Sequence, residues 1–202
     1  CSPNNPTGTP AANGLVADLE KAVGSYGGLL VLDEAYGEFA SESAACLVSE
    51  DRCVVVSRTF SKTWAMAGAR LGYLIAPTWC VAELEKVALP YHLDALKLEV
   101  GVLALGYVDA MRERVERLVA ERERMATALD GLAVTTWPSA ANFILLRPDS
   151  RPGREVWQDL VERPVPVRDF TTMPGLEECL RVTIGSRVEN DMFLDALREV
   201  LR

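Results

Sequence analysis

Gly27-Gly28-Leu29-Leu30-Val31-Leu32-Asp33-Glu34 is the segment that decides the fold, because a short apolar run lies between a glycine pair and two carboxylates. Such a run is typical of a strand buried on both faces, as in a parallel sheet. Cys53-Val54-Val55-Val56 and Leu71-Gly72-Tyr73-Leu74-Ile75 repeat the pattern. Residues 15–26 have the apolar spacing of a helix, which the glycine pair ends. Helices that alternate with buried strands predict an α/β sheet.

The rest of the chain predicts more helices and a second α/β unit. A helix over residues 78–89 ends at Pro90, and a long helix with a charged face covers residues 96–129. The second unit has predicted strands at 141–146, 165–168 and 180–184, and predicted helices at 155–161 and 189–201. The change in composition over residues 89–98 marks the best domain boundary.

Composition and charge argue against several classes of function. The 202 residues carry a net charge of -8 without a basic cluster, so the electrostatic footprint of nucleic-acid binding is missing. Every apolar run is too short to cross a bilayer. The five cysteines form no C-x-x-C pair beside a single histidine, so we expect buried thiols in a reducing cytoplasm and no metal site. The chain opens on Cys1 rather than Met, and we expect it to be a piece of a longer polypeptide.

Thr59-Phe60-Ser61-Lys62, followed by Arg70, holds the groups that a phosphorylated aldehyde needs. A lysine amine can form a Schiff base with an aldehyde, and hydroxyls with a guanidinium suit a phosphate. This combination indicates pyridoxal 5'-phosphate (PLP), with Lys62 as the amine and Thr59, Ser61 and Arg70 around the phosphate. Backbone N–H groups would help if a helix starts after Lys62. Ligands of α/β sheets bind at the carboxyl ends of strands, and Asp33 and Lys62 follow two predicted strands.

Three further side chains match what PLP requires of a protein. Asp33 can hold the pyridine nitrogen protonated, and Tyr36 and Asn5 can bond the phenolic oxygen. Taken alone, each residue has a plainer explanation: Asp33 fits a helix N-cap, Tyr36 a core aromatic and Asn5 a turn residue. Lys62 alone would be a surface lysine, and Arg70 an ion-pair partner. Their joint occurrence in this order favours the cofactor site.

Four motifs make the chain similar to a known family. They are Ser2-Pro3-Asn4-Asn5-Pro6-Thr7-Gly8, Asp33-Glu34-Ala35-Tyr36, Ser61-Lys62 with Arg70, and Leu180-Arg181-Val182-Thr183-Ile184-Gly185. With them the chain resembles PLP enzymes of the aspartate-aminotransferase fold (fold type I), and within these the histidinol-phosphate aminotransferase branch. The resemblance runs from Cys1 to Arg202.

The resemblance implies an α/β fold in three parts. Residues 1–90 would form the second part of a mainly parallel-sheet, PLP-binding large domain, residues 91–130 a long interdomain helical segment, and residues 131–202 a small C-terminal α/β domain. Members of the family are longer, and their additional part precedes Cys1. We therefore expect this chain to be the C-terminal portion only, and the activity to belong to the longer parent.

The resemblance also implies roles for individual residues. Lys62 would be the Schiff-base lysine and proton shuttle, and the cofactor contacts above would keep their roles. Arg181 would grip the α-carboxylate of the substrate, which suits the two-pronged donor geometry of a guanidinium. Arg168 would contact the substrate phosphate. Arg168 also fits a surface arginine at a strand end, and related aromatic-amino-acid aminotransferases carry an arginine here as well.

The implied reaction converts L-histidinol phosphate and 2-oxoglutarate to imidazole-acetol phosphate and L-glutamate, in histidine biosynthesis. The partners would be amino-acid and phosphorylated keto substrates, with a homodimer in the full-length form and neither nucleic acid nor membrane. Two alternatives use the same scaffold: an aromatic-amino-acid aminotransferase and a decarboxylase of a phosphorylated amino acid. Two belong to other classes: a PLP-sensing domain of a transcription regulator and an inert fragment.

Overall fold

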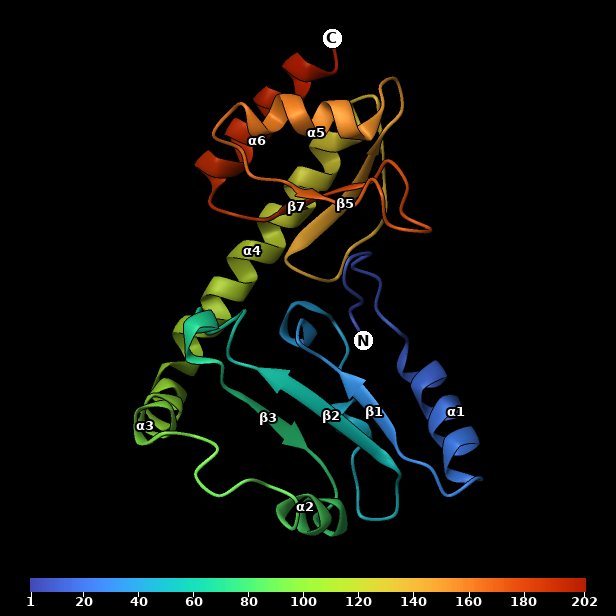
Figure 1. Cartoon of the computed structure of the whole chain (residues 1–202), viewed down its shortest axis with the longest axis vertical. Coiled ribbons are helices and arrows are strands. Elements are labelled where there is room, and N and C mark those ends of the chain that lie inside the picture. The colour runs from blue at the N-terminus through green and yellow to red at the C-terminus, as the bar shows by residue number, and fades with distance from the viewer. The chain divides into compact units, whose positions relative to one another are not determined.

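The computed structural model describes residues 1–202, which divide into two compact units (Figure 1). The first unit contains residues 1–3 and 10–115, and the second contains residues 4–9 and 116–202. Each unit is described by itself below. The division into residues 1–90, 91–130 and 131–202 stays a prediction.

The first unit is built on a three-stranded sheet in the order β1-β2-β3. Strand β1 (Leu30–Asp33) runs parallel to β2 (Val54–Thr59), and β3 (Gly72–Ile75) runs antiparallel to β2, as the arrows in Figure 1 show. All three predicted strands are confirmed in place. The expectation of burial on both faces is met only by the first three residues of β2. It is wrong for the two edge strands, because β1 leaves Val31 59% exposed and the first three residues of β3 are exposed.

Helices and short turns make up the rest of the first unit, which includes α4 only as far as Val115. Helix α1 (Asn13–Gly24) buries Val16 against Leu32 of β1 and Val56 of β2. The other helices are α2 (Thr78–Glu85), α3 (Ala95–Ala104) and α4 (Val108–Leu129), and the 3-10 turns are η1 (Gly37–Phe39), η2 (Ala44–Leu47), η3 (Ala67–Ala69) and η4 (Leu105–Tyr107).

Two helix predictions need correction. The helix expected over residues 78–89 ends at Glu85. The single helix expected over residues 96–129 is interrupted by η4, which contains Gly106. Glycine costs about 1 kcal/mol relative to alanine inside a helix, so Gly106 weakens the helix at this point, although Gly101 is accommodated inside α3.

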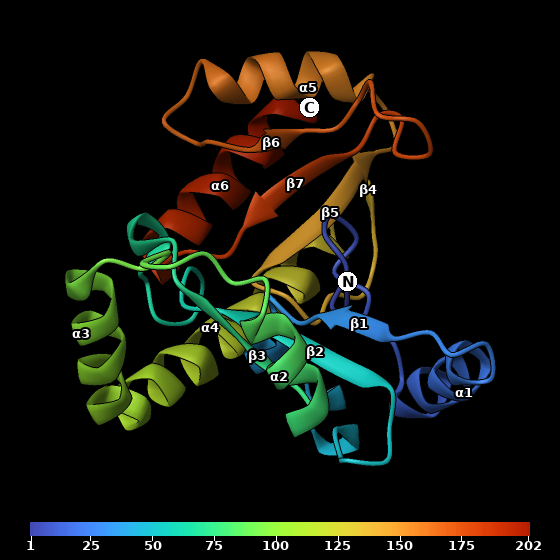
Figure 2. The ribbon, with the colours of Figure 1, turned by 60° about the horizontal axis from the view of Figure 1, so that its bottom comes forward.

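The second unit is an antiparallel sheet with helices against it (Figure 2). The strand order is β4-β5-β7-β6, with β4 (Val134–Thr136), β5 (Phe143–Pro148), β6 (Arg168–Asp169) and β7 (Leu180–Thr183). Helices α5 (Gly153–Val161) and α6 (Arg187–Val200) complete the unit with the end of α4. Sequence reasoning missed β4, and the strand expected at residues 165–168 is wrong except at Arg168, the first residue of the two-residue β6.

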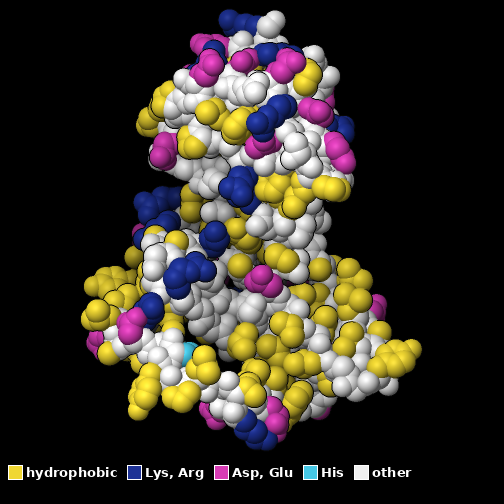
Figure 3. Space-filling model, viewed as in Figure 1, with side chains coloured by type: hydrophobic (Ala, Val, Ile, Leu, Met, Phe, Trp, Pro, Cys, Tyr) yellow, Lys and Arg dark blue, Asp and Glu magenta, His cyan; other side chains and the backbone are white.

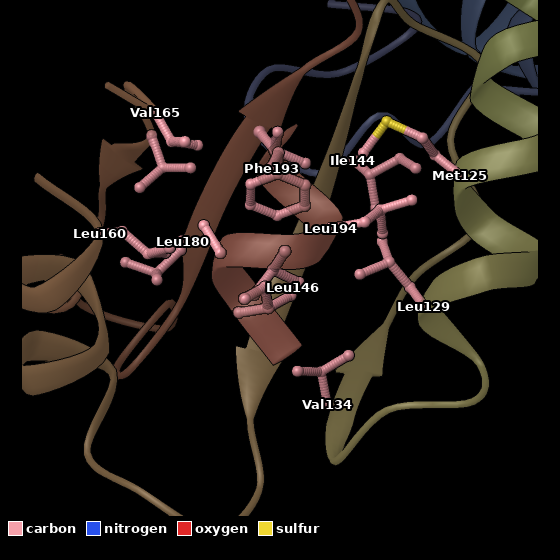
Figure 4. Packing of buried hydrophobic residues seen from close by; sticks show 14 of the residues in the cluster. Met125, Leu129, Val134, Ile144, Leu146, Leu160, Val165, Leu180, Phe193 and Leu194 are labelled. Atoms are coloured by element: carbon pink, nitrogen blue, oxygen red, sulfur yellow. The ribbon is translucent and has the colours of Figure 1, made fainter. Parts of the chain in front are cut away.

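One apolar face of this second sheet forms the core of the unit. Ile144 and Leu146 of β5 alternate with side chains of the opposite face, so both meet the helices. Met125 of α4 and Leu194 of α6 pack in the same cluster, and Figure 4 shows these side chains converging. The cluster holds β5 and β7, and β7 carries Arg181.

The surface of the first unit is rich in apolar side chains, which appear yellow in Figure 3. Leu96, Val102 and Leu105 of the α3 region are 78, 66 and 59% exposed. No helix in residues 1–202 combines the length and apolar character needed to cross a membrane.

The thiols differ from the expectation that all are buried. Cys80 and Cys179 are buried, Cys53 is intermediate, and Cys1 and Cys46 are exposed. Cys1 and Cys46 lie in a terminal stretch and a 3-10 turn, where little packs over them.

Candidate functional site

The carboxyl ends of β1 and β2 lie at one edge of the first sheet, because the two strands are parallel and Asp33 pairs with Ser57. The Asp33 Oδ1 atom accepts a hydrogen bond from the Ala35 N–H at 3.0 Å and lies 3.4 Å from the Ser57 hydroxyl oxygen. The Asp33 carboxylate is therefore held at the strand end while its side chain stays exposed. Only the 3-10 turn η1 follows, with Tyr36 at its N-cap position, so Asp33 caps no helix.

Lys62 and Tyr36 are brought together at this edge. The Lys62 Nζ atom lies 5.4 Å from the centre of the Tyr36 ring, within the range of a cation–π contact. Tyr36 is buried, at 5% exposure, whereas Lys62 is exposed. The turn after Lys62 is fixed from α4, because Arg114 Nη1 donates to the Thr63 carbonyl oxygen at 2.9 Å. The lysine amine thus sits on a tethered turn and remains accessible.

The predicted phosphate-binding residues lie along the connection from β2 to β3. The Thr59 and Ser61 hydroxyl oxygens are 2.9 Å apart, and the Ser61 N–H donates to Thr59 Oγ1 at 3.1 Å. Arg70 follows η3 with a left-handed φ of 50°, and its exposed guanidinium donates weakly to the Ala67 carbonyl at 3.4 Å. Two hydroxyls and a guanidinium therefore belong to one short connection.

The expectation of helical N–H groups after Lys62 is wrong. Residues 60–65 form turns and bends, and the next helical element is the short η3. The left-handed backbone of Ala65, with φ of 55°, prevents a helix from continuing through this segment.

The second unit contains the other predicted residues. Asn5 lies in a loop that closes on itself, since the Gly8 N–H donates to the Asn4 carbonyl at 2.7 Å. Arg181 Nη1 donates to the Asn5 carboxamide oxygen. The Arg181 guanidinium also lies 4.6 Å from the centre of the Phe143 ring and 5.6 Å from that of Phe170. Asn5 therefore contacts Arg181 in this unit, and its role toward the cofactor stays a prediction.

Arg168 and Arg181 are direct cross-strand partners in the β6–β7 ladder. Directly opposite residues in an antiparallel pair project from the same face of the sheet. Like charges directly opposite each other destabilise a sheet, a cost that an anionic ligand would offset. The pair is thus suited to a ligand with anionic groups.

Several side chains that hold these residues in place escaped the sequence analysis. Arg58 and Glu34 form an ion pair at 2.8 Å behind the strand ends, and Glu38 lies 3.5 Å from the same guanidinium. Burial raises the pKa of the Glu38 carboxyl, and the neighbouring Glu34 carboxylate adds to the rise. Alternating charge at the ends of two neighbouring strands could have been the signal for this network.

Comparison with known proteins identifies a family for the chain. The family model for aminotransferase class I and II matches residues 1–197. The histidinol-phosphate aminotransferase of Frankia casuarinae is 42% identical over 205 residues, covering 100% of this chain and 50% of the relative. That of Geotalea uraniireducens is 37% identical over 199 residues, covering 98% and 56%. The crystal structure of histidinol-phosphate aminotransferase from Sinorhizobium meliloti in complex with pyridoxal-5'-phosphate has a TM-score of 0.86 at 26% identity, covering 100% of this chain and 56% of that one.

Fold and sequence together define a member of the α/β enzymes that use PLP. The chain belongs to the family of class I and II aminotransferases. It spans about half the length of the curated relatives it matches.

The residues of the first unit fit PLP, the cofactor of this family. Lys62 offers an accessible amine, and Asp33 offers a carboxylate at the same sheet edge. Thr59, Ser61 and Arg70 supply the donors that a phosphate needs.

Gly8→Ala should destabilise the second unit. Gly8 has φ of +78°, and a Cβ atom there would meet the Ser139 side chain and lie 3.0 Å from its Cα. We expect the free energy of unfolding to fall by about 2 kcal/mol, from backbone strain and overpacking. Urea denaturation measures it. Gly131→Ala is the matched control, because the nearest atom to its Cβ would be 3.7 Å away. Equal loss in both variants would show that Gly8 is not constrained as described.

Glu38→Gln should raise the free energy of unfolding at pH 7. The pKa of Glu38 is higher in the folded protein than its ordinary value of 4.5, so ionisation above that pH opposes folding. The gain should shrink as the pH falls below 4.5, where folded and unfolded forms are both protonated. Thermal melting across this pH range tests the expectation. Exposed Glu85→Gln serves as the control, and a Glu38→Gln effect independent of pH would contradict the assignment.

Proposed function

We propose that the protein acts in PLP-dependent transamination between L-histidinol phosphate and 2-oxoglutarate, giving imidazole-acetol phosphate and L-glutamate. The cross-strand pair of Arg168 and Arg181 is the observation that carries this choice of substrates. One arginine suits a phosphate and the other a carboxylate, and these anions distinguish the two substrates of the reaction. The named relatives at 37 and 42% identity support the same reaction.

The first unit would hold the cofactor and move the proton. Bound PLP supplies an electron sink for the bond to the substrate α-carbon. Lys62 anchors the cofactor through its amine, then takes the proton from the α-carbon of the amino substrate and returns it as general acid. Asp33 keeps the pyridine nitrogen protonated, and Tyr36 donates to the phenolic oxygen. These are roles that the accessible amine and the exposed carboxylate allow.

The remaining cofactor contacts would come from hydroxyl, guanidinium and amide groups. Thr59, Ser61 and Arg70 bind the phosphate, helped by the close approach of the two hydroxyls. Asn5 is proposed as a second partner of the phenolic oxygen through its amide N–H₂. Its carboxamide oxygen already accepts from Arg181, which leaves the amide end as the donor.

Arg181 would bind the α-carboxylate of glutamate. Its guanidinium is oriented by Asn5 and contacts the Phe143 and Phe170 rings, so few rotamers remain to be lost on binding. Arg168, which is exposed on the edge strand β6, would bind the phosphate of the other substrate. The different surroundings of the two arginines support different tasks.

For the full-length protein we propose a cytoplasmic homodimer. The exposed Leu96, Val102 and Leu105 side chains support an apolar surface for self-association. The five free cysteines support a reducing compartment.

Arg168→Ala should weaken binding of L-histidinol phosphate by roughly 10- to 100-fold, because hydrogen bonds to charged groups contribute about 1.5–3 kcal/mol. Binding of glutamate should change by no more than about twofold in the same variant. Calorimetric titration of the PLP-loaded protein measures both. Arg198→Ala, which removes an exposed ion pair with Asp195, is the control.

Equal losses for both ligands in Arg168→Ala would contradict the assignment of the phosphate to this residue. Release of carbon dioxide from a phosphorylated amino acid would indicate the decarboxylase alternative instead.

A further inference from the structure

A buried ion pair links the two strands directly behind the candidate cofactor site. Asp33 pairs with Ser57, and the Glu34 N–H continues the ladder by donating to the Ser57 carbonyl at 2.9 Å. Glu34 and Arg58 are therefore opposite each other at the next step. Arg58 donates from Nη2 at 2.8 Å and from Nε at 3.2 Å to the same Glu34 oxygen. Their side chains are only 3% and 15% exposed.

Neighbouring groups complete this pair, so that both Glu34 oxygens are engaged. The Ala44 N–H donates to Oε1 at 2.6 Å, and the Ser43 hydroxyl donates to Oε2 at 2.8 Å. Gly37 leaves room for the carboxylate, because a Cβ atom there would lie 2.9 Å from Glu34 Oε2. The pair, called here the Glu34–Arg58 clamp, is thus fixed from several sides.

The clamp residues are covalent neighbours of the proposed cofactor contacts. Glu34 follows Asp33 and precedes Tyr36 by two positions, and Arg58 immediately precedes Thr59. Side chains alternate along a strand, so Asp33 is exposed while Glu34 points into the unit. Holding Glu34 against Arg58 therefore fixes the separation between the segment that carries Asp33 and the segment that leads to Lys62.

We propose that the Glu34–Arg58 clamp is a positioning device that sets the geometry of the cofactor site. This inference rests on the proposed function. A buried ion pair often contributes less to stability than apolar residues of the same volume, so stability alone gives no reason for charged residues here. A misplacement of about 1 Å in a site can lower the reaction rate about 100-fold. A rigid spacing between the segments that hold PLP is therefore valuable.

The double variant Glu34→Gln/Arg58→Met tests the clamp. Single substitutions would leave one buried charge without its partner and could unfold the protein, whereas the double variant removes both clamp charges and keeps the volumes. Because Glu38 lies 3.5 Å from the same guanidinium, the clamp variant, the control variant and the protein they are compared with all carry Glu38→Gln. The dissociation constant of PLP should rise at least about tenfold. The pH midpoint of the visible absorbance of Lys62-bound PLP should also shift, because the contacts of Asp33 and Tyr36 with the cofactor are altered.

The control is Glu20→Gln/Arg52→Met, a second partly buried ion pair of the same unit, at 3.0 Å and at the opposite end of β2. We expect this variant to keep the dissociation constant and pH midpoint of the protein with Glu38→Gln alone. A folded Glu34→Gln/Arg58→Met variant with unchanged values for both would overturn the positioning role. An equal loss in the control would do the same, because it would indicate general destabilisation.

Failure of wild-type protein to bind PLP would instead count against the proposed function. Amide hydrogen exchange then decides about the clamp. Exchange at residues 35–39 should be faster in Glu34→Gln/Arg58→Met than in the control variant, and unchanged exchange would overturn the inference.

Discussion

The parallel pairing of β1 with β2 is the constraint on which the candidate cofactor site depends. It places Asp33 opposite Ser57, so that the segment after β1 and the segment after β2 leave the sheet at the same edge. The central strand is secured by Val54, Val55 and Val56, which are at most 2% exposed. A slip of one residue would turn Asp33 inward and Glu34 outward, which would exchange the site carboxylate with the clamp carboxylate.

The second unit places two arginines, Arg168 and Arg181, on one face of its sheet. Its apolar core fixes β5 and β7 from one side, leaving the other face to Arg181 and the Phe143 ring. Arg168 reaches the same face from the two-residue strand β6. Two like charges directly opposite each other lower the stability of the sheet. A bound anionic ligand would offset this loss, which is why the pair suits an anion-binding site.

The apolar runs predicted much of the fold, because continuous apolar residues are the ones that a folded chain buries in strands. Leu29–Leu32 and Cys53–Val56 are continuous apolar runs, and both became strands of the predicted sheet. The direction of β3 could not be predicted, since it depends on the turn from residue 60 to 71 and its left-handed Ala65 and Arg70. The break at η4 was also missed, because the expected helix contains both Gly101 and Gly106, and the sequence does not reveal at which of them packing will compensate.

The site shows the same limit. The motifs predicted Asp33, Lys62 and Arg181 as site residues from their residue types and from their order along the chain. The pairing of Arg168 with Arg181, and of Glu34 with Arg58, arises from strand register, which neither propensity nor spacing specifies.

The most direct test of this account is a titration of the protein with PLP, followed by borohydride reduction and peptide mapping. The account predicts a saturable visible band, with the reduced label on Lys62 and loss of both in Lys62→Ala. Absence of the band, or labels spread over Lys21, Lys86 and Lys97, would contradict it.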